Sequence, residues 1–158
     1  MLIQNIIFNV ILFISVLALV SAYFIEYILD YSACNLCLIE RIPYFLVLII
    51  ILIGFFLNIF VKFILIFLGF IFLCATFLSF YHFGIEQGFF EESLVCIANN
   101  ETNILNKNDL LNELQNTKIS CKNVEFKLFG LSLATINLII SLVLSVICFR
   151  LFINYDKN

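Results

Sequence analysis

Hydrophobic residues form four long runs along the chain, separated by short polar segments. The runs contain no Asp, Glu, Lys or Arg and comprise Met1–Ile25, Ile42–Val61, Phe63–Ile85 and Leu128–Phe149. About 20 apolar residues in an α-helix cross the hydrocarbon core of a bilayer, and lipid offers no partner to an open backbone. The pattern therefore predicts an all-α integral membrane protein. We expect a single membrane domain, 1–158, that forms a four-helix transmembrane bundle with spans at about 5–25, 42–61, 63–84 and 129–150.

The composition supports a membrane location and excludes two other classes. Of the 158 residues, 64% are hydrophobic and 12% are charged, whereas soluble domains are about 45–50% apolar and about 25% charged. There is no basic cluster to neutralise a phosphate backbone, so we expect membrane lipid and no nucleic acid as a partner. Val20-Ser21-Ala22 loosely resembles a signal-peptide cleavage site. No Lys or Arg precedes the first run, however, and the run is too long, so we expect it to remain as a span.

The connections place two loops on one side of the membrane. With four crossings, loops 26–41 and 85–128 share one compartment, and both termini and Lys62 lie in the other. Lys62, Arg150 and Lys157 favour a cytoplasmic location for the side with the termini. The long loop, however, also carries four Lys residues, so the rule based on basic residues does not decide the orientation.

Four of the six cysteines lie in the two loops that share a compartment. Cys34 and Cys37 form a C-x-x-C pair in the first loop, and Cys96 and Cys121 lie in the long loop. The other two, Cys74 and Cys148, fall inside spans, where we expect them to be small buried hydrophobes. A metal site is not expected, because the loop cysteines lack a second short-spaced pair and the only histidine, His82, ends the third span. A Cys96–Cys121 staple would stabilise a long loop but would leave the C-x-x-C pair unexplained.

The C-x-x-C spacing suits redox chemistry, because one sulfur can take part in disulfide exchange while the second stays close enough to resolve the mixed disulfide. The pair lies just before the second span, and Pro43 fits the first turn of that helix. Arg41 is four residues after Cys37, on the same face if the helix begins there, and a guanidinium favours thiolate. Arg41 has a simpler interpretation as an interfacial residue whose ion-pair partner is its neighbour Glu40.

Three sequence features resemble one known family, the disulfide bond formation protein B (DsbB) family. They are C-N-L-C-L-I-E-R-I-P-Y at the start of the second span, the later pair Cys96 and Cys121, and F-K-L-F-G-L-S-L-A-T-I-N before the fourth span. The resemblance covers nearly the whole chain. Ala33 stands where many members have Pro, and Phe126 stands where the aromatic residue is often Trp. Both differences leave the partner and quinone preferences open.

The resemblance implies a function for each loop cysteine. Family members reoxidise DsbA, a thioredoxin-fold oxidase of the bacterial periplasm, and pass the electrons to a membrane quinone. Carried over, Cys96 is attacked by the partner and Cys121 is its intramolecular partner. Cys34 exchanges with that pair, and Cys37 lies against ubiquinone or menaquinone, with Arg41 polarising it. The implied location is the bacterial inner membrane, as a multi-pass protein with cytoplasmic termini and periplasmic redox loops.

Two further features have candidate roles. His82 lies at the outer end of the third span, level with Cys37, where it could donate a hydrogen bond or proton to a reduced quinone or simply contact head groups. The segment 108–114 has the pattern of a short amphipathic helix that lies on the membrane surface.

Two other protein classes remain as alternatives. One is a four-helix reductase of the vitamin K epoxide reductase kind, in which the quinone-facing C-x-x-C falls late in the helix order. The other is a four-span structural or adhesion protein with a disulfide-stapled outer loop, which predicts inert Cys34 and Cys37.

Overall fold

The computed structural model describes residues 2–57, 61–91, 96, 121, 126–128 and 130–155. Its four long helices are α1 (Leu2–Tyr27), α3 (Ile42–Leu57), α4 (Val61–Glu86) and α7 (Leu133–Asn154). A short helix, α2 (Asn35–Ile39), precedes α3. Two short strands, β1 (Lys127–Leu128) and β2 (Leu131–Ser132), pair antiparallel just before α7, with Leu128 opposite Leu131.

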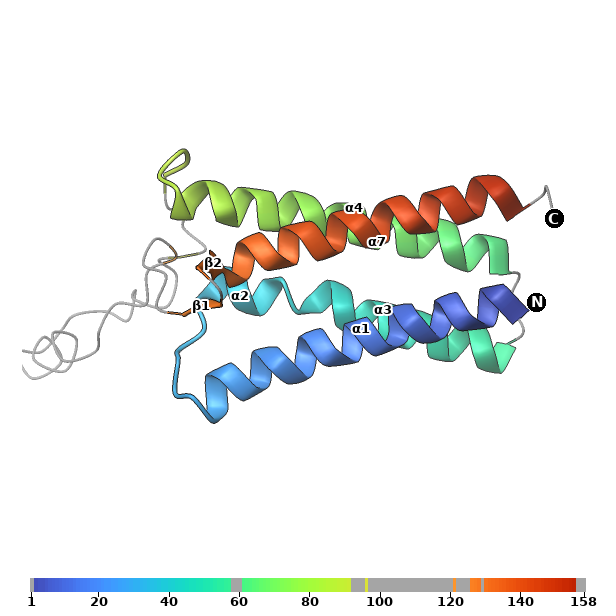
Figure 1. Ribbon diagram of the computed structural model, residues 1–158, viewed down its shortest axis with the longest axis horizontal. Coiled ribbons are helices and arrows are strands. Elements are labelled where there is room, and N and C mark those ends of the chain that lie inside the picture. Colours follow the sequence, from blue (N-terminus) through green and yellow to red (C-terminus); the bar gives the residue numbers. More distant parts are fainter. Residues whose placement is uncertain are drawn as a thin grey trace, which may run out of the picture.

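Four segments are long and apolar enough to cross a membrane: Ile7–Tyr27, Asn35–Phe55, Val61–Glu86 and Leu133–Asn154. The prediction of a four-helix, multi-pass membrane protein is thus confirmed. Figure 1 shows that the start of α1 and the end of α7 lie at one end of the bundle, and that α2 and the β1–β2 pair lie at the opposite end. The most extensive helix contact joins α4 to α7, and α3 contacts both α1 and α4.

Small residues let the helices approach closely inside the bundle. Ser15, Ser79 and Ser141 are fully buried, and Ser15 and Ser141 bond carbonyls of their own helices, which keeps the hydroxyls paired in an apolar setting. Ser145 Oγ donates instead across the α4–α7 contact to the Gly69 carbonyl, at 3.2 Å. A Cβ on Gly69 would lie only 3.2 Å from the Phe149 ring. This is the close packing through small residues that holds transmembrane helices together.

The start of the fourth span differs from the prediction. The charge-free run suggested a helix from about residue 129, but α7 begins at Leu133. Gly130 adopts a positive φ of 83° in the turn between the two strands, a conformation that glycine tolerates best. Ser132 then caps α7, because its side chain accepts the Thr135 N–H at 3.2 Å.

The second span begins as Pro43 predicts, but the helix that precedes it is separate. α3 starts at Ile42, whereas α2 ends at Ile39. Pro43 has no N–H to donate to the carbonyl four residues earlier, and its ring crowds that carbonyl. The chain therefore turns at Glu40 and Arg41 between the two helices.

The two cysteines inside spans have different surroundings. Cys148 is fully buried in the bundle core, as expected. Cys74 is exposed on the outer face of α4, so the expectation that it is buried was wrong. The predicted surface helix at 108–114 and the connection at 58–60 lie outside the described residues.

Candidate redox site

Cys34 begins the short helix α2 and is held by the backbone of Cys37. As the N-cap residue it has an extended conformation, and its Sγ accepts the Cys37 N–H at 3.2 Å. Cys34 is buried and Cys37 is half-buried, and both are free thiols. The C-x-x-C spacing thus folds into one helical turn that brings the second residue back to the first sulfur.

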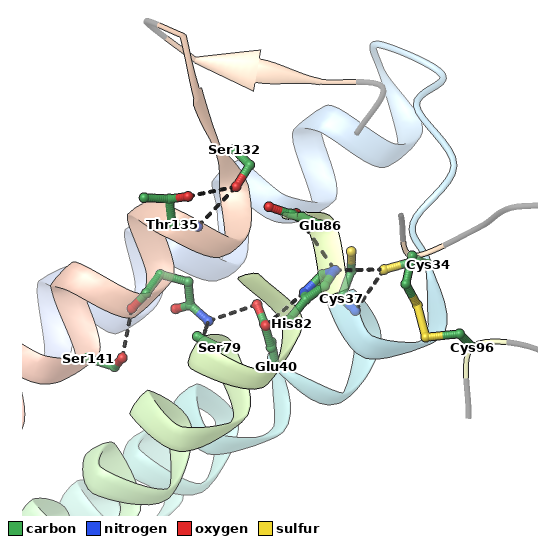
Figure 2. Close-up of polar contacts among 12 residues, drawn as sticks. Cys34, Cys37, Glu40, Ser79, His82, Glu86, Cys96, Ser132, Thr135 and Ser141 are labelled. Carbon is green, nitrogen blue, oxygen red and sulfur yellow. Dashed lines mark hydrogen bonds and ion pairs between the residues drawn. A yellow bond between two sulfur atoms is a disulfide. The ribbon is translucent and has the colours of Figure 1, made fainter. Parts of the chain in front are cut away.

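His82 lies between Cys34 and a carboxylate. Its Nε2 is 3.5 Å from Cys34 Sγ, and its Nδ1 is 2.9 Å from Glu40 Oε1. Both Glu40 and His82 are more than nine-tenths buried, and Figure 2 shows the three side chains in one line. An ionised carboxylate only accepts, so Nδ1 carries a proton and Nε2 faces the thiol. This is the geometry of a thiol–imidazole pair oriented by an acid.

The adjacency of Glu40 and Arg41 in the sequence had suggested an ion pair between them. That expectation was wrong, because the two side chains have other partners. Arg41 forms an ion pair with Glu26 of α1, and its guanidinium lies 4.9 Å from the centroid of the Tyr23 ring. The expectation that Arg41 continues the helical face of Cys37 was also wrong, because α2 ends between them. The turn directs Glu40 into the bundle and Arg41 toward α1.

The surroundings of Cys34 favour the thiolate. The side chain of Cys37 and then the hydrogen bond and charge of His82 lower the pKa of Cys34 to about 5, against the opposing effect of burial. A thiolate is the nucleophile in disulfide exchange, and a thiol with a lowered pKa is also a better leaving group. Cys34 is therefore suited to exchange close to neutral pH and below it.

The second cysteine pair meets this site at the same end of the bundle. Cys96 and Cys121 form a disulfide, with their Cα atoms 5.9 Å apart. The disulfide and Cys34 belong to one buried cluster that also includes Leu36 and Ile85, and Figure 2 shows the disulfide beside Cys34. The structure thus brings together all four predicted cysteines, with the loop pair oxidised and the C-x-x-C pair reduced.

A half-buried amide extends the site into the bundle. Asn137 of α7 donates from Nδ2 to Glu40 Oε2 at 2.9 Å and to Ser79 Oγ at 2.8 Å, and its Oδ1 accepts from the Tyr44 hydroxyl. Asn137 was not among the residues predicted from the sequence. A lone amide in a run free of charges was the available signal, because polar groups inside spans are costly unless they have partners.

The thiols and the histidine also offer ligands of the kind that metals bind. One ligand atom each from Cys34, Cys37 and His82 lies within 4.8 Å of the others. His82 was expected to lie apart from the cysteines, and this expectation was wrong. Structural zinc sites use four protein ligands, and this group supplies three. The expected absence of a metal site stays a prediction.

The residues assigned to quinone binding do not share one position. Cys37 is half-buried on α2, and Leu38 and Ile42, which follow it in the chain, have exposed side chains. Arg41 contacts Glu26 through one terminal nitrogen, and a guanidinium has further N–H groups that can donate to a carbonyl. His82 instead has both ring nitrogens next to Cys34 and Glu40.

Comparison with known proteins gives one consistent family. The sequence model for "Disulfide bond formation protein DsbB" matches residues 4–151. An uncharacterized protein of Rickettsia prowazekii (strain Madrid E) is 30% identical over 153 residues, which cover 94% of this chain and 87% of the relative. No solved structure gives a significant match.

Proposed function

Because this chain belongs to the disulfide bond formation protein B (DsbB) family of membrane thiol–disulfide oxidoreductases, we propose that it transfers electrons from a periplasmic dithiol protein to a membrane quinone. The dithiol protein is a thioredoxin-fold oxidase of the DsbA type, and the quinone is ubiquinone or menaquinone. One observation carries the proposal: the Cys96–Cys121 disulfide packs against Cys34 of a reduced C-x-x-C pair.

The reaction begins at the loop pair. A thiolate of the partner attacks Cys96, which breaks the Cys96–Cys121 bond and forms an intermolecular disulfide. The partner's second thiolate then breaks that bond, so the partner leaves oxidised and the loop pair holds two electrons as thiols. Each exchange forms one S–S bond and breaks one.

The electrons then pass to the C-x-x-C pair by two further exchanges. A loop thiolate attacks Cys34 of the Cys34–Cys37 disulfide and releases Cys37. The other loop thiolate closes the loop disulfide and releases Cys34. A leaving thiol with a lowered pKa departs faster, and the pKa of Cys34 is lowered to about 5. The state after this step has a loop disulfide and two free inner thiols, as the structure does.

His82 serves this second exchange through charge and proton transfer. Its Nε2 lies 3.5 Å from Cys34 Sγ, so the neutral ring can take up the thiol proton at Nε2, and the imidazolium formed in this way stabilises the departing thiolate. Glu40 holds the opposite nitrogen at 2.9 Å and favours the charged ring. We assign His82 to the sulfur chemistry of Cys34, in addition to the quinone role that the sequence suggested.

Reoxidation of Cys34 and Cys37 at the membrane completes the cycle. When bound, a quinone would supply an acceptor for two electrons and two protons, and Cys34 and Cys37 would give these up as they return to the disulfide. Cys37 is the half-buried thiol of the pair, and Arg41 supplies hydrogen-bond donors beside it in the chain. The oxidant needs a potential above the about −120 mV of a DsbA-type partner, which a lipid-soluble quinone provides.

The proposed location is the bacterial inner membrane. The redox loops then face the periplasm and both termini face the cytoplasm. Lys62 and Arg150 lie near the end of the bundle opposite the cysteines, which agrees with the tendency of basic residues to remain cytoplasmic.

Turnover by the purified protein in lipid nanodiscs tests this proposal. Reduced DsbA-type protein and a soluble quinone analogue are added, and quinone absorbance is followed. We expect consumption by the unaltered chain and by Cys74→Ser, a matched control in the same membrane domain, and none by Cys37→Ser. Equal consumption by Cys37→Ser would contradict the proposal and favour a structural protein with a stapled loop.

A further inference from the structure

We propose that Asn137 is a positioning residue, which holds Glu40 so that His82 presents its Nε2 to Cys34. The inference deepens the proposed function and rests on it. Asn137 lies on α7 and contacts neither cysteine in the described part of the chain. It is joined to them through Glu40 Oε2 at 2.9 Å, Glu40 Oε1 to His82 at 2.9 Å, and His82 to Cys34 at 3.5 Å.

The partners of Asn137 fix which way its amide points. Glu40 as a carboxylate can only accept, so it must face the amide nitrogen. That nitrogen also donates to Ser79 Oγ at 2.8 Å, and the Tyr44 hydroxyl donates to the amide oxygen. If the Asn137 amide were reversed, its oxygen would face the Glu40 carboxylate, and its nitrogen would face the Tyr44 hydroxyl that now donates to the oxygen. Partners on α3, on α4 and in the turn between α2 and α3 thus specify one orientation of this side chain.

The fixed amide in turn fixes the carboxylate and the imidazole. With Oε2 held by Asn137, Glu40 presents Oε1 to His82 Nδ1. The proton on Nδ1 then leaves Nε2 to exchange a proton with Cys34, as when an orienting acid sets the tautomer of a catalytic histidine. Without the amide, Glu40 would lose a charge-assisted hydrogen bond in a buried site and could rotate away from the ring.

Other ionisable groups also face His82 and Cys34, and the test must keep them constant. Glu86, one turn after His82 on α4, places Oε1 3.8 Å from His82 Nε2. Cys37 contributes its N–H and thiol from α2. Tyr44 of α3 reaches the site through Asn137. Neither Glu86 nor Cys37 contacts Asn137 in the described residues, so a change at Asn137 acts on Cys34 through Glu40.

The experiment measures the thiolate of Cys34 directly. The full chain, reduced and in nanodiscs, receives short pulses of iodoacetamide from pH 4 to pH 9, and mass spectrometry quantifies alkylation at Cys34. For Asn137→Leu we expect the midpoint of the profile to rise by about 1 pH unit, a tenfold loss of thiolate below the midpoint. Ser145→Ala, which removes a buried hydroxyl of the same helix away from the site, should leave the midpoint unchanged.

A double variant separates positioning from general damage to the fold. In a His82→Gln background, Asn137→Leu should cause no further shift, because its effect passes through the ring. Tyr44→Phe keeps the ring and removes only the hydroxyl donor, so it should also raise the midpoint, by a smaller amount. This variant replaces Asn137→Leu in the test if Asn137→Leu does not fold.

Two outcomes would overturn the inference. One is an unchanged midpoint in Asn137→Leu, or in Tyr44→Phe if the first variant does not fold. The other is an equal shift with and without His82. The assay uses no quinone and no partner protein, so its failure is distinguishable from failure of the proposed function.

Discussion

Replacing His82 with glutamine tests how the thiolate of Cys34 is stabilised. Glutamine keeps a polar side chain that fills much of the space but cannot carry a positive charge. Because the pKa of Cys34 is lowered to about 5, its thiolate persists above that pH and is lost as the pH falls through it. His82→Gln removes one of the causes of that lowering and leaves the contribution of Cys37 in place.

The magnitude follows from the geometry. Unit charges 3.5 Å apart attract by about 5 kcal/mol at an effective dielectric constant of about 20, or about 3.5 pKa units. Loss of ring hydration offsets part of this attraction, so we expect the pKa of Cys34 to rise by about 2 units, to about 7. At pH 6 the thiolate fraction then falls from about 90% to about 10%, a ninefold decrease.

The pulsed alkylation profile of Cys34 measures this change. The rate at pH 6 should fall about ninefold, while the rate at pH 9 should be nearly unchanged because both proteins are then thiolate. Tyr81→Phe, next to His82 in α4, is the matched control. A midpoint near pH 5 in His82→Gln would refute the reasoning, since the thiolate would then depend on Cys37 alone.

Substitutions at three further positions test other parts of the account. Arg41→Gln should raise the KM for quinone about tenfold with little effect on the KM for the dithiol partner, because one charged donor is lost; equal KM values for quinone would exclude this role. Gly69→Val should destabilise the bundle by about 1–3 kcal/mol in SDS titration, since a Cβ there lies 3.2 Å from the Phe149 ring; an unchanged midpoint would contradict this packing. Ser132→Ala should lower stability by about 1 kcal/mol through loss of the α7 cap, and Ser132→Thr, which keeps the hydroxyl and adds no charge beside Glu86, should restore it.

Much of the membrane fold was predictable because bilayer thickness constrains it directly. The four charge-free runs gave the number of spans, and Pro43 located the start of α3. The strand pair before α7 was missed because Leu128 and Leu131 read as the beginning of a helix in an apolar run. Gly130 and the Ser132 cap were the available signals.

The site was harder to predict because its contacts join residues distant in sequence. The four cysteines could be placed in one compartment by counting spans. The approach of His82 to Cys34 depends on how α4 packs beside α2, which periodicity does not give. Glu40 was misassigned because its neighbour Arg41 has opposite charge, whereas the turn between α2 and α3 sends the two side chains apart.

The most direct test of the account is whether Cys34 exchanges with the loop pair. In a Cys37→Ser, Cys96→Ser double variant that also carries Cys74→Ser and Cys148→Ser, the remaining cysteines are Cys34 and Cys121, which share one buried cluster. After mild oxidation in nanodiscs, mass spectrometry without reduction should find an intramolecular Cys34–Cys121 disulfide. If both thiols stay free, or can be labelled only from opposite sides of the membrane, the two pairs do not meet and the proposed route for electrons is wrong.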